Sequence, residues 1–212
     1  MISNKNIDQI FSLLKQQTKD FPLPSVTAIK HKANHFQILV ITLLSARTTD
    51  KTIDKLSPNL LNKISSPQDF LKLTQKQIEN LIYPVSFYKT KAKHLKQIAQ
   101  ELNYQPIPQT LSELLRLPGI GRKSANLILI EAFNKPGICV DTHVHRITNR
   151  WNYLNTKSPH ETELELREIL PKKHWKKINS LLVAHGQNIC KPLKPNCFKC
   201  LLNKHCPTDN LK

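Results

Sequence analysis

Apolar side chains recur along the chain with the period of an α-helix. The first stripe lies near the amino terminus and consists of Ile7, Ile10, Phe11 and Leu14. A second stripe runs through Ala92, Leu95, Ile98, Ala99 and Leu102, and a third, less regular one joins Leu164 to Ile169 and Leu170. We expect each stripe to face a core.

Signals for the starts of helices accompany these stripes. Ser or Thr is followed three residues later by Glu or Gln, the capping-box pattern, at Thr74/Gln77, Thr110/Glu113 and Ser158/Glu161. Pro67 and Pro159 stand at first-turn positions. The chain has only 4 glycines and no Asn-Gly or Asp-Gly pair, so it carries little β-hairpin chemistry. The sequence predicts an all-α protein of about ten short helices, with its prolines between the helices.

Size and charge narrow the class of protein. The 212 residues allow one large domain or two small lobes. The excess of 32 Lys and Arg over 15 Asp and Glu gives a net charge of +17, which indicates a polyanionic partner, nucleic acid ahead of an anionic membrane surface. Residues 171–206 hold eight lysines and no acid. This stretch is either a solvated basic face or a phosphate-binding face, and mutual repulsion favours the second.

Hydropathy argues against a membrane protein. The most apolar window, Ile38 to Leu44, is far shorter than the roughly 20 residues of a spanning helix. The amino-terminal residues lack the apolar run and cleavage site of a signal peptide. We therefore expect a cytoplasmic protein in a reducing compartment, where the five cysteines are metal ligands or buried thiols rather than disulfides. A chain of this size needs no second subunit to bind nucleic acid, so we also expect a monomer.

Four cysteines lie close together near the carboxyl end, in the pattern C-x6-C-x2-C-x5-C: Cys190, Cys197, Cys200 and Cys206. Four thiolates suit either zinc or an iron–sulfur cluster. Only Cys197 and Cys200 form the C-x2-C knuckle of structural zinc sites, so the spacing favours a [4Fe–4S] cluster, with zinc as the alternative. Such a centre would hold the loop that carries Lys191 and Lys194 against a phosphate backbone.

The segment LPGIGRKSANLIL (117–129) reads as a tight hairpin between two helices, since helical residues 111–116 precede it. Gly119 and Gly121 can take positive φ and bring backbone N–H groups against a phosphate at the start of the second helix. A plain interhelical loop is the alternative. This segment predicts a contact with the nucleic-acid backbone that reads no base.

Lys123 and Asp141 are the candidate catalytic residues. Lys123 lies beside Arg122 in the first turn of the second helix, where positive potential favours the neutral amine that attacks a carbonyl-like carbon; its simpler interpretation is one more surface cation. Asp141 follows an apolar run at 138–140. Its carboxylate either caps the next helix or assists catalysis, and the two roles are compatible.

Taken in order, LPGIGRKSANLIL, VDTHVHR (140–146) and the cysteine pattern resemble the helix-hairpin-helix DNA glycosylases, and within them the endonuclease III family. LLSARTTD (43–50) and SFYKTKA (86–92) occupy the places of related motifs. The resemblance covers most of the chain. It implies two lobes: a six-helix barrel at about 26–135 with the hairpin motif at about 111–130, and a second lobe from 1–25 and 136–212 with the cluster loop at 190–206. Damaged double-stranded DNA would bind in the cleft between them, and the metal centre would be a [4Fe–4S] cluster.

The resemblance also implies the reaction. In base excision repair, Lys123 would attack deoxyribose C1′ of a flipped nucleotide while Asp141 stabilises positive charge on the sugar. The resulting Schiff base would allow β-elimination 3′ to the lesion. Related glycosylases that only remove a base place another residue where Lys123 stands, and enzymes for 8-oxoguanine generally lack the cysteine tail. Oxidised pyrimidines are therefore the expected substrates.

Motif alignment assigns the remaining DNA contacts. Phe87 would be an apolar wedge and Arg47 would fill the gap left by the flipped nucleotide, although Phe87 also suits a core position. The family commonly has Gln at the place of Arg47 and Gly at that of Ser86. Three further residues would line the pocket, or else cap helices or make buried hydrogen bonds: Ser45, Asp50 and His143. The alternatives are a related glycosylase with another lesion preference and a non-catalytic iron–sulfur DNA-binding module.

Overall fold

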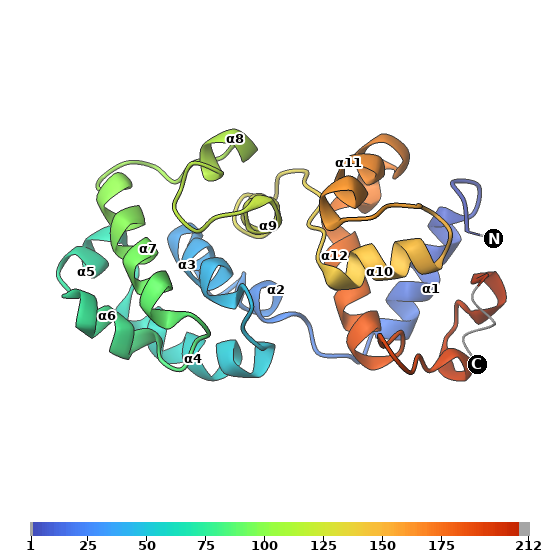
Figure 1. Cartoon of the computed structure of the whole chain (residues 1–212), viewed down its shortest axis with the longest axis horizontal. Helices are drawn as coiled ribbons and strands as arrows, with labels where there is room; N and C mark the ends of the chain where they lie inside the picture. Colours follow the sequence, from blue (N-terminus) through green and yellow to red (C-terminus); the bar gives the residue numbers. More distant parts are fainter. Residues whose placement is uncertain (1, 208–212) are drawn as a thin grey trace. The chain divides into compact units, whose positions relative to one another are not determined.

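The computed structural model describes residues 2–207, and all regular structure in this range is helical (Figure 1). It contains twelve α-helices and two short 3-10 helices. The predicted all-α class is therefore confirmed. Within the same range no helix combines the length and apolarity needed to cross a membrane.

The chain divides into two compact units, which are described one by one: Ser25–Lys135, and Met1–Pro24 with Pro136–Lys212. The unit Ser25–Lys135 contains eight helices: α2 (Ser25–Ile29), α3 (His35–Ser45), α4 (Asp50–Lys63), α5 (Pro67–Leu71), α6 (Gln75–Ile82), α7 (Tyr88–Glu101), α8 (Leu111–Leu114) and α9 (Arg122–Glu131). Three of these have only four or five residues.

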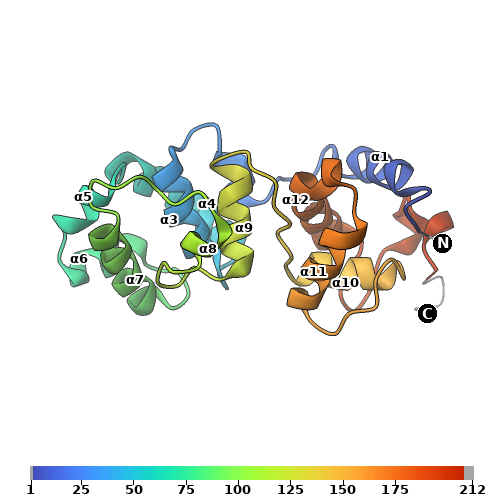
Figure 2. The same cartoon turned by 90° about the horizontal axis from the view of Figure 1, so that it is seen from above.

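Helix α3 forms the centre of this unit. Residues 36–44 are buried, because the helix is apolar on all sides. The helix begins at a capping box made by Asn34 and Gln37. It packs against α2, α4, α7 and α9, which surround it in Figures 1 and 2. The most apolar window of the sequence is thus the core helix of the unit.

The remaining sequence patterns of this unit are largely confirmed. The α7 stripe is buried, and Thr74 with Gln77 forms a full capping box at the start of α6. The prediction that prolines avoid helix interiors was wrong at Pro58, which lies inside α4. A proline there cannot donate to the carbonyl four residues earlier, but the buried Leu56 and Leu60 on either side keep the helix packed.

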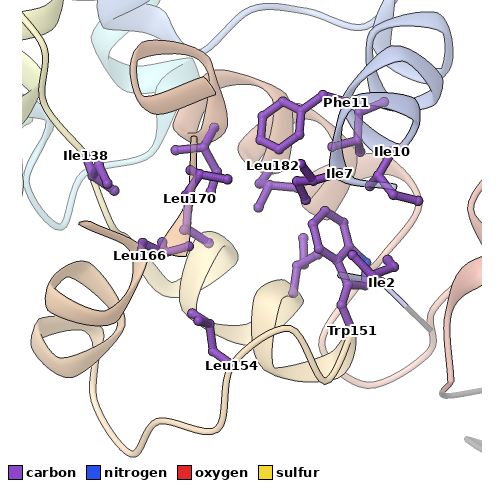
Figure 3. Packing of buried hydrophobic residues seen from close by; sticks show 14 of the residues in the cluster. Ile2, Ile7, Ile10, Phe11, Ile138, Trp151, Leu154, Leu166, Leu170 and Leu182 are labelled. Atoms are coloured by element: carbon purple, nitrogen blue, oxygen red, sulfur yellow. The ribbon is translucent and has the colours of Figure 1, made fainter. Parts of the chain in front are cut away.

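The other unit contains α1 (Ile7–Thr18), α10 (Thr142–Arg150), α11 (Pro159–Ile169), α12 (Lys172–Asn188) and the 3-10 helices η1 (Cys197–Lys199) and η2 (Asn203–His205). Helix α12 packs against α1 and α10. Figure 3 shows Ile7 and Phe11 of α1 beside Leu182 of α12. The third predicted stripe was right at Leu170, which is buried, and wrong at Leu164, which is 46% exposed; the buried Leu166, four residues before Leu170, faces the core instead.

Candidate active site and cysteine centre

The predicted hairpin connects α8 to α9, and its two glycines differ. Gly119 has φ of +78°, and a Cβ built there would lie 2.4 Å from Nδ1 of His94, so only glycine fits. Gly121 has φ of −94° and ψ of 175°. The expectation of a positive φ was right for Gly119 and wrong for Gly121, because Gly121 is the N-cap of α9 and N-cap residues adopt extended backbone.

The start of α9 is open to an approaching ligand. Gly121 supplies no side-chain cap to the first N–H groups of the helix, and a Cβ built there would meet nothing within 4 Å. The first N–H groups of a helix lack intrahelical acceptors and lie at the positive end of its dipole. Backbone donors and open space therefore coincide at this end of α9, as a phosphate contact requires.

Lys123 projects from the same helix end. It is the second residue of α9 and is exposed, next to the half-buried Arg122. The seven residues that follow, 124–130, are all buried. The helix is thus anchored in the core of its unit while the amine of Lys123 faces outward, where it can reach a ligand seated on the hairpin.

Asp141 is the N-cap of α10. Its Oδ1 accepts hydrogen bonds from the backbone N–H groups of His143 and Val144, both at 2.9 Å. The structure therefore shows the capping role that the sequence indicated. Both donors bond to the same oxygen, so the cap does not use Oδ2. Lys123 belongs to the unit Ser25–Lys135 and Asp141 to the other unit.

Arg47 and Phe87 lie together within one unit. Arg47 follows α3 with φ of 56°, and Phe87 precedes α7 with φ of 58°, so both have left-handed backbone. The guanidinium carbon of Arg47 is 5.8 Å from the centroid of the Phe87 ring, a cation–π distance. Phe87 is 61% exposed, so the core interpretation of this residue was wrong. Two separate motifs thus meet in one exposed pair.

Lys91, in the motif SFYKTKA, was not predicted as a site residue and contacts the residues on both sides of Arg47. It is 7% exposed. Its Nζ donates to the carbonyl oxygens of Leu44 at 2.8 Å and Ala46 at 2.6 Å, and to Oγ1 of Thr48 at 3.1 Å. Burial lowers its pKa to about 8. The signal was present: Lys91 stands four residues before Leu95, on the buried face of α7.

The three predicted pocket residues have partners inside their own units. Ser45 donates to the carbonyl of Thr42 at 2.8 Å, and Asp50 accepts from Ser25 at 3.0 Å. Nδ1 of His143 is 3.1 Å from Nη2 of Arg146. A Cβ built on Gly186 of α12 would lie 2.3 Å from Nδ1 of His143. His143 therefore packs between α10 and α12. The pocket role of these residues stays a prediction.

The four cysteines line one cavity in the second unit. Cys190 follows α12, Cys197 begins η1, and Cys200 and Cys206 follow η1 and η2. Three of them pack against the hydrophobic core that Figure 3 shows: Cys190, Cys200 and Cys206. Burial raises the pKa of the Cys200 thiol to about 11. One short segment thus brings together four thiols.

Positively charged and N–H groups surround these thiols. Nη1 of Arg150 is 3.4 Å from the sulfur of Cys190 and donates to the Lys191 carbonyl at 2.7 Å. Nη2 of Arg146 donates to the Cys190 carbonyl at 2.9 Å. Neither arginine was predicted from the sequence, although their four-residue spacing on α10 indicates one face of the helix. They fix the start of the loop.

His185 is the third residue near the thiols that the sequence analysis missed. It is 1% exposed, and its Nε2 is 3.8 Å from the sulfur of Cys200. Burial, with a smaller contribution from the Arg146 charge, lowers the pKa of His185 to about 4. No sequence signal singles it out, because one histidine on an amphipathic helix is common. Lys191 and Lys194 of the same segment are exposed.

Comparison with known proteins assigns the family. The family model "HhH-GPD superfamily base excision DNA repair protein" matches residues 40–172. Endonuclease III of Thermotoga maritima is 39% identical over 201 residues, 93% of this chain and 92% of that protein. The solved structure of a trapped endonuclease III–DNA covalent intermediate matches with a TM-score of 0.86 at 29% identity, over 98% of this chain and 97% of that chain. A thermostable thymine-DNA glycosylase matches with a TM-score of 0.83 at 25% identity, over 96% of each chain. The chain therefore belongs to the endonuclease III family of DNA glycosylases with apurinic-site lyase activity, within the helix-hairpin-helix base excision repair proteins.

Proposed function

We propose that this chain acts as a monomer on double-stranded DNA, removes oxidised pyrimidines and then cuts the strand 3′ to the abasic site. The observation that carries the proposal is the exposed Lys123 in the first turn of α9, beside an uncapped helix end and a hairpin that only Gly119 can form. A nucleophile and a phosphate contact thus share one rigid element.

Lys123 and Asp141 divide the chemistry in this proposal. The neutral amine of Lys123 forms a bond to C1′ while the bond from C1′ to the base breaks, and the base leaves with a proton. Asp141 stabilises the positive charge that develops on the sugar, and its Oδ2 is the oxygen that the α10 cap leaves available. Opening of the sugar gives an imine, loss of the C2′ proton expels the 3′ phosphate, and hydrolysis releases Lys123.

The remaining exposed residues supply recognition. Phe87 enters the base stack as a wedge and Arg47 occupies the space of the flipped nucleotide, which their exposure and mutual contact support. Phosphate contacts come from the hairpin and from the cysteine segment, through Gly119, Gly121, Arg122, Lys191 and Lys194.

A second candidate function is a related glycosylase with another lesion preference. Two observations favour it: the match to a thymine-DNA glycosylase, and an arginine at position 47, where the family resemblance leads us to expect Gln. Arg47 adds a charge and donors beside the wedge. Base removal from duplexes with thymine glycol and with a mismatched thymine compares the two candidates directly.

For the cofactor we propose a [4Fe–4S] cluster held by the four cysteines: Cys190, Cys197, Cys200 and Cys206. Their common cavity, the N–H donor of Arg150 beside Cys190 and the ring nitrogen of His185 near Cys200 suit thiolate ligands. When bound, the cluster supplies a rigid cross-link for the loop. A brown protein with equal iron and acid-labile sulfide is expected; a colourless zinc protein would contradict this.

The decisive experiment is borohydride trapping on two duplexes, one with thymine glycol and one with an abasic site. We expect a covalent adduct and a cut strand with the native protein on both duplexes and with Lys123→Gln on neither, while lesion-DNA binding is retained. Lys76→Gln is the matched control, because Lys76 is also an exposed lysine at the second position of a helix in the same unit. Cutting that persists without Lys123 contradicts the proposal, and a native protein that traps neither duplex favours the binding-module alternative.

Two variants of Asp141 separate its cap from its catalytic role. Asn keeps a side-chain acceptor, so Asp141→Asn is expected to leave the melting temperature nearly unchanged and to slow base removal by about a hundredfold. Asp141→Ala loses the cap as well and is expected to be less stable by about 1 kcal/mol. Single-turnover base removal and thermal melting measure the two effects. A native rate of base removal by Asp141→Asn would contradict the catalytic role of Asp141 and leave capping of α10 as its only role.

A further inference from the structure

The hydrogen bonds of the buried Lys91 ammonium link the start of α7 to the loop that follows α3. An ammonium group has three donors, and three acceptors lie within 3.1 Å of Nζ. Two of these acceptors are main-chain carbonyls at and just beyond the end of α3, where helix carbonyls lack intrahelical donors. The third is Thr48. None of the three is a carboxylate, so the contact is a main-chain clamp rather than an ion pair.

The clamped segment is the one that presents Arg47. Ala46 and Thr48 flank Arg47 directly, and both bond to Lys91. Between them the backbone of Arg47 is left-handed, a conformation that a non-glycine residue keeps only when its surroundings hold it. The ammonium of Lys91 therefore fixes the residues on both sides of a strained position.

The other end of the contact lies next to Phe87. The backbone N–H of Lys91 donates to the Phe87 carbonyl at 3.0 Å, which places the two residues one helical turn apart at the start of α7. Phe87 is also left-handed. The single residue Lys91 thus connects the first turn of α7, which follows Phe87, to the loop of Arg47.

We propose that Lys91 is a positioning residue that sets the placement of Arg47 against Phe87 for recognition of the damaged nucleotide. This inference rests on the DNA-probing roles proposed above for Arg47 and Phe87. Lys91 itself touches no substrate in this scheme, because it is buried; it acts through the segment it clamps. Loss of the clamp is expected to impair extrusion of a damaged base more than chemistry at a site that has already lost its base, since unpairing and unstacking are then easier.

The same helix offers a matched control. Nζ of Lys96, in α7, donates to three carbonyls, those of Phe70 at 3.1 Å, Leu71 at 2.9 Å and Leu73 at 2.6 Å. Like Lys91, Lys96 is an ammonium with three oxygen acceptors, although it is half-buried and all three acceptors are carbonyls. The segment it clamps is the end of α5, which carries no proposed DNA contact. A general effect of losing such a clamp on stability will therefore appear in both Lys91→Met and Lys96→Met.

The experiment compares these two variants with the native protein. Thermal melting, trapping on an abasic-site duplex and single-turnover base removal from a thymine glycol duplex are measured for each. We expect both variants to melt lower, but only Lys91→Met to lose about ten- to hundredfold in base removal, with abasic-site trapping within about threefold of native. Equal losses of base removal in the two variants, or an equal loss of both activities in Lys91→Met, would overturn the proposal. Failure of the native protein to trap the abasic site would instead overturn the proposed function.

A mutant cycle tests the route of the effect. If Lys91 acts through Arg47, then Lys91→Met lowers base removal much less in an Arg47→Ala background than in the native one, whereas independent roles give additive losses and contradict the proposal. Thr48→Val serves if Lys91→Met does not fold, because it removes one acceptor and keeps the side-chain shape. It is expected to lower base removal about threefold and to lower the melting temperature as well, because one donor of a buried ammonium is left without its acceptor; unchanged base removal would count against the clamp.

Discussion

Arg47, Phe87 and Gly119 show how single residues hold the recognition surface in unusual backbone conformations. All three have positive φ, at 56°, 58° and 78°. Glycine adopts this region without strain, whereas other residues lose about 1–2 kcal/mol there. The chain therefore places a glycine where His94 leaves no room for a side chain, and uses non-glycine residues where the side chain itself is needed. Strain at Arg47 and Phe87 is balanced by their neighbours, Lys91 among them.

Substitutions at the two hairpin glycines are predicted to have different effects, one on stability and the other on DNA binding. Gly119→Ala is expected to lower the free energy of unfolding by at least about 1–2 kcal/mol, because alanine must take a left-handed conformation and its Cβ would meet His94. Gly121→Ser is expected to leave stability unchanged, because serine is a preferred N-cap, yet to weaken DNA binding by filling the open space before the α9 N–H groups. Urea unfolding and binding to duplex DNA measure the two effects. Native-like DNA binding by Gly121→Ser would contradict the phosphate contact.

Sequence predicts residues of this kind when the cause is local. The four cysteines, the caps at Thr74 and Ser158, and the Gly119 turn depend on neighbours within a few positions, so spacing alone indicates them. Lys91 and His185 depend on partners elsewhere in the fold: the carbonyl of Leu44 is 47 residues from Lys91, and the sulfur of Cys200 is 15 residues from His185. Composition gives no hint of such partners.

Helices α3 and α7 illustrate the element scale, because one buried cation joins them. The stripe of α7 made that helix predictable from periodicity, whereas α3 showed only as an apolar window, because it is apolar on all sides. Their connection was not predictable, since the polar acceptors for Lys91 are main-chain carbonyls, which carry no residue identity. The short helices α5 and α8 were indicated by their start signals, Pro67 and the Thr110/Glu113 pair, and not by periodicity, because four or five residues span too little of a period.

The Lys91 contact between α3 and α7 predicts a pH dependence of stability. Burial lowers the Lys91 pKa from 10.5 to about 8 in the folded chain. Between these pH values the unfolded chain binds more protons than the folded one at this residue, so its contribution to the free energy of unfolding rises with pH and is lost as pH falls through 8. Urea unfolding of the native protein and of Lys91→Met across this range is the measurement, since other titrating groups cancel in the difference. As pH rises from about 8 to 10.5, the free energy of unfolding of the native protein is expected to increase relative to that of Lys91→Met. A difference between the two proteins that does not change with pH would contradict the lowered pKa.

For the whole molecule, the net charge of +17 predicts salt-dependent DNA binding, but the structure shows that not every lysine contributes. The stretch 171–206 contains no acid, yet Lys173 meets Asp8 of α1 at 2.6 Å, and Nε2 of His174 lies 2.7 Å from the same carboxylate. Hydrogen bonds from Lys173 and then His174 lower the Asp8 pKa. The acid that balances this end of α12 comes from the other end of the sequence, so the one-dimensional charge pattern overstates the basic face.

Single lysine variants in residues 171–206 are therefore expected to differ in their effect on DNA binding, according to whether the lysine is already paired with an acid. Each phosphate contact that is lost should reduce the slope of log Kobs against log salt concentration by about 1. We expect this reduction for Lys191→Gln and for Lys194→Gln, whose exposed side chains lie on the segment anchored by Arg150. Lys173→Gln removes the same charge from the same stretch but is expected to leave the slope nearly unchanged, because Lys173 is already paired with Asp8. Fluorescence anisotropy on undamaged duplex DNA between about 50 and 200 mM salt gives the slopes. Equal reductions in all three variants would mean that net charge, and not the position of the loop, determines binding.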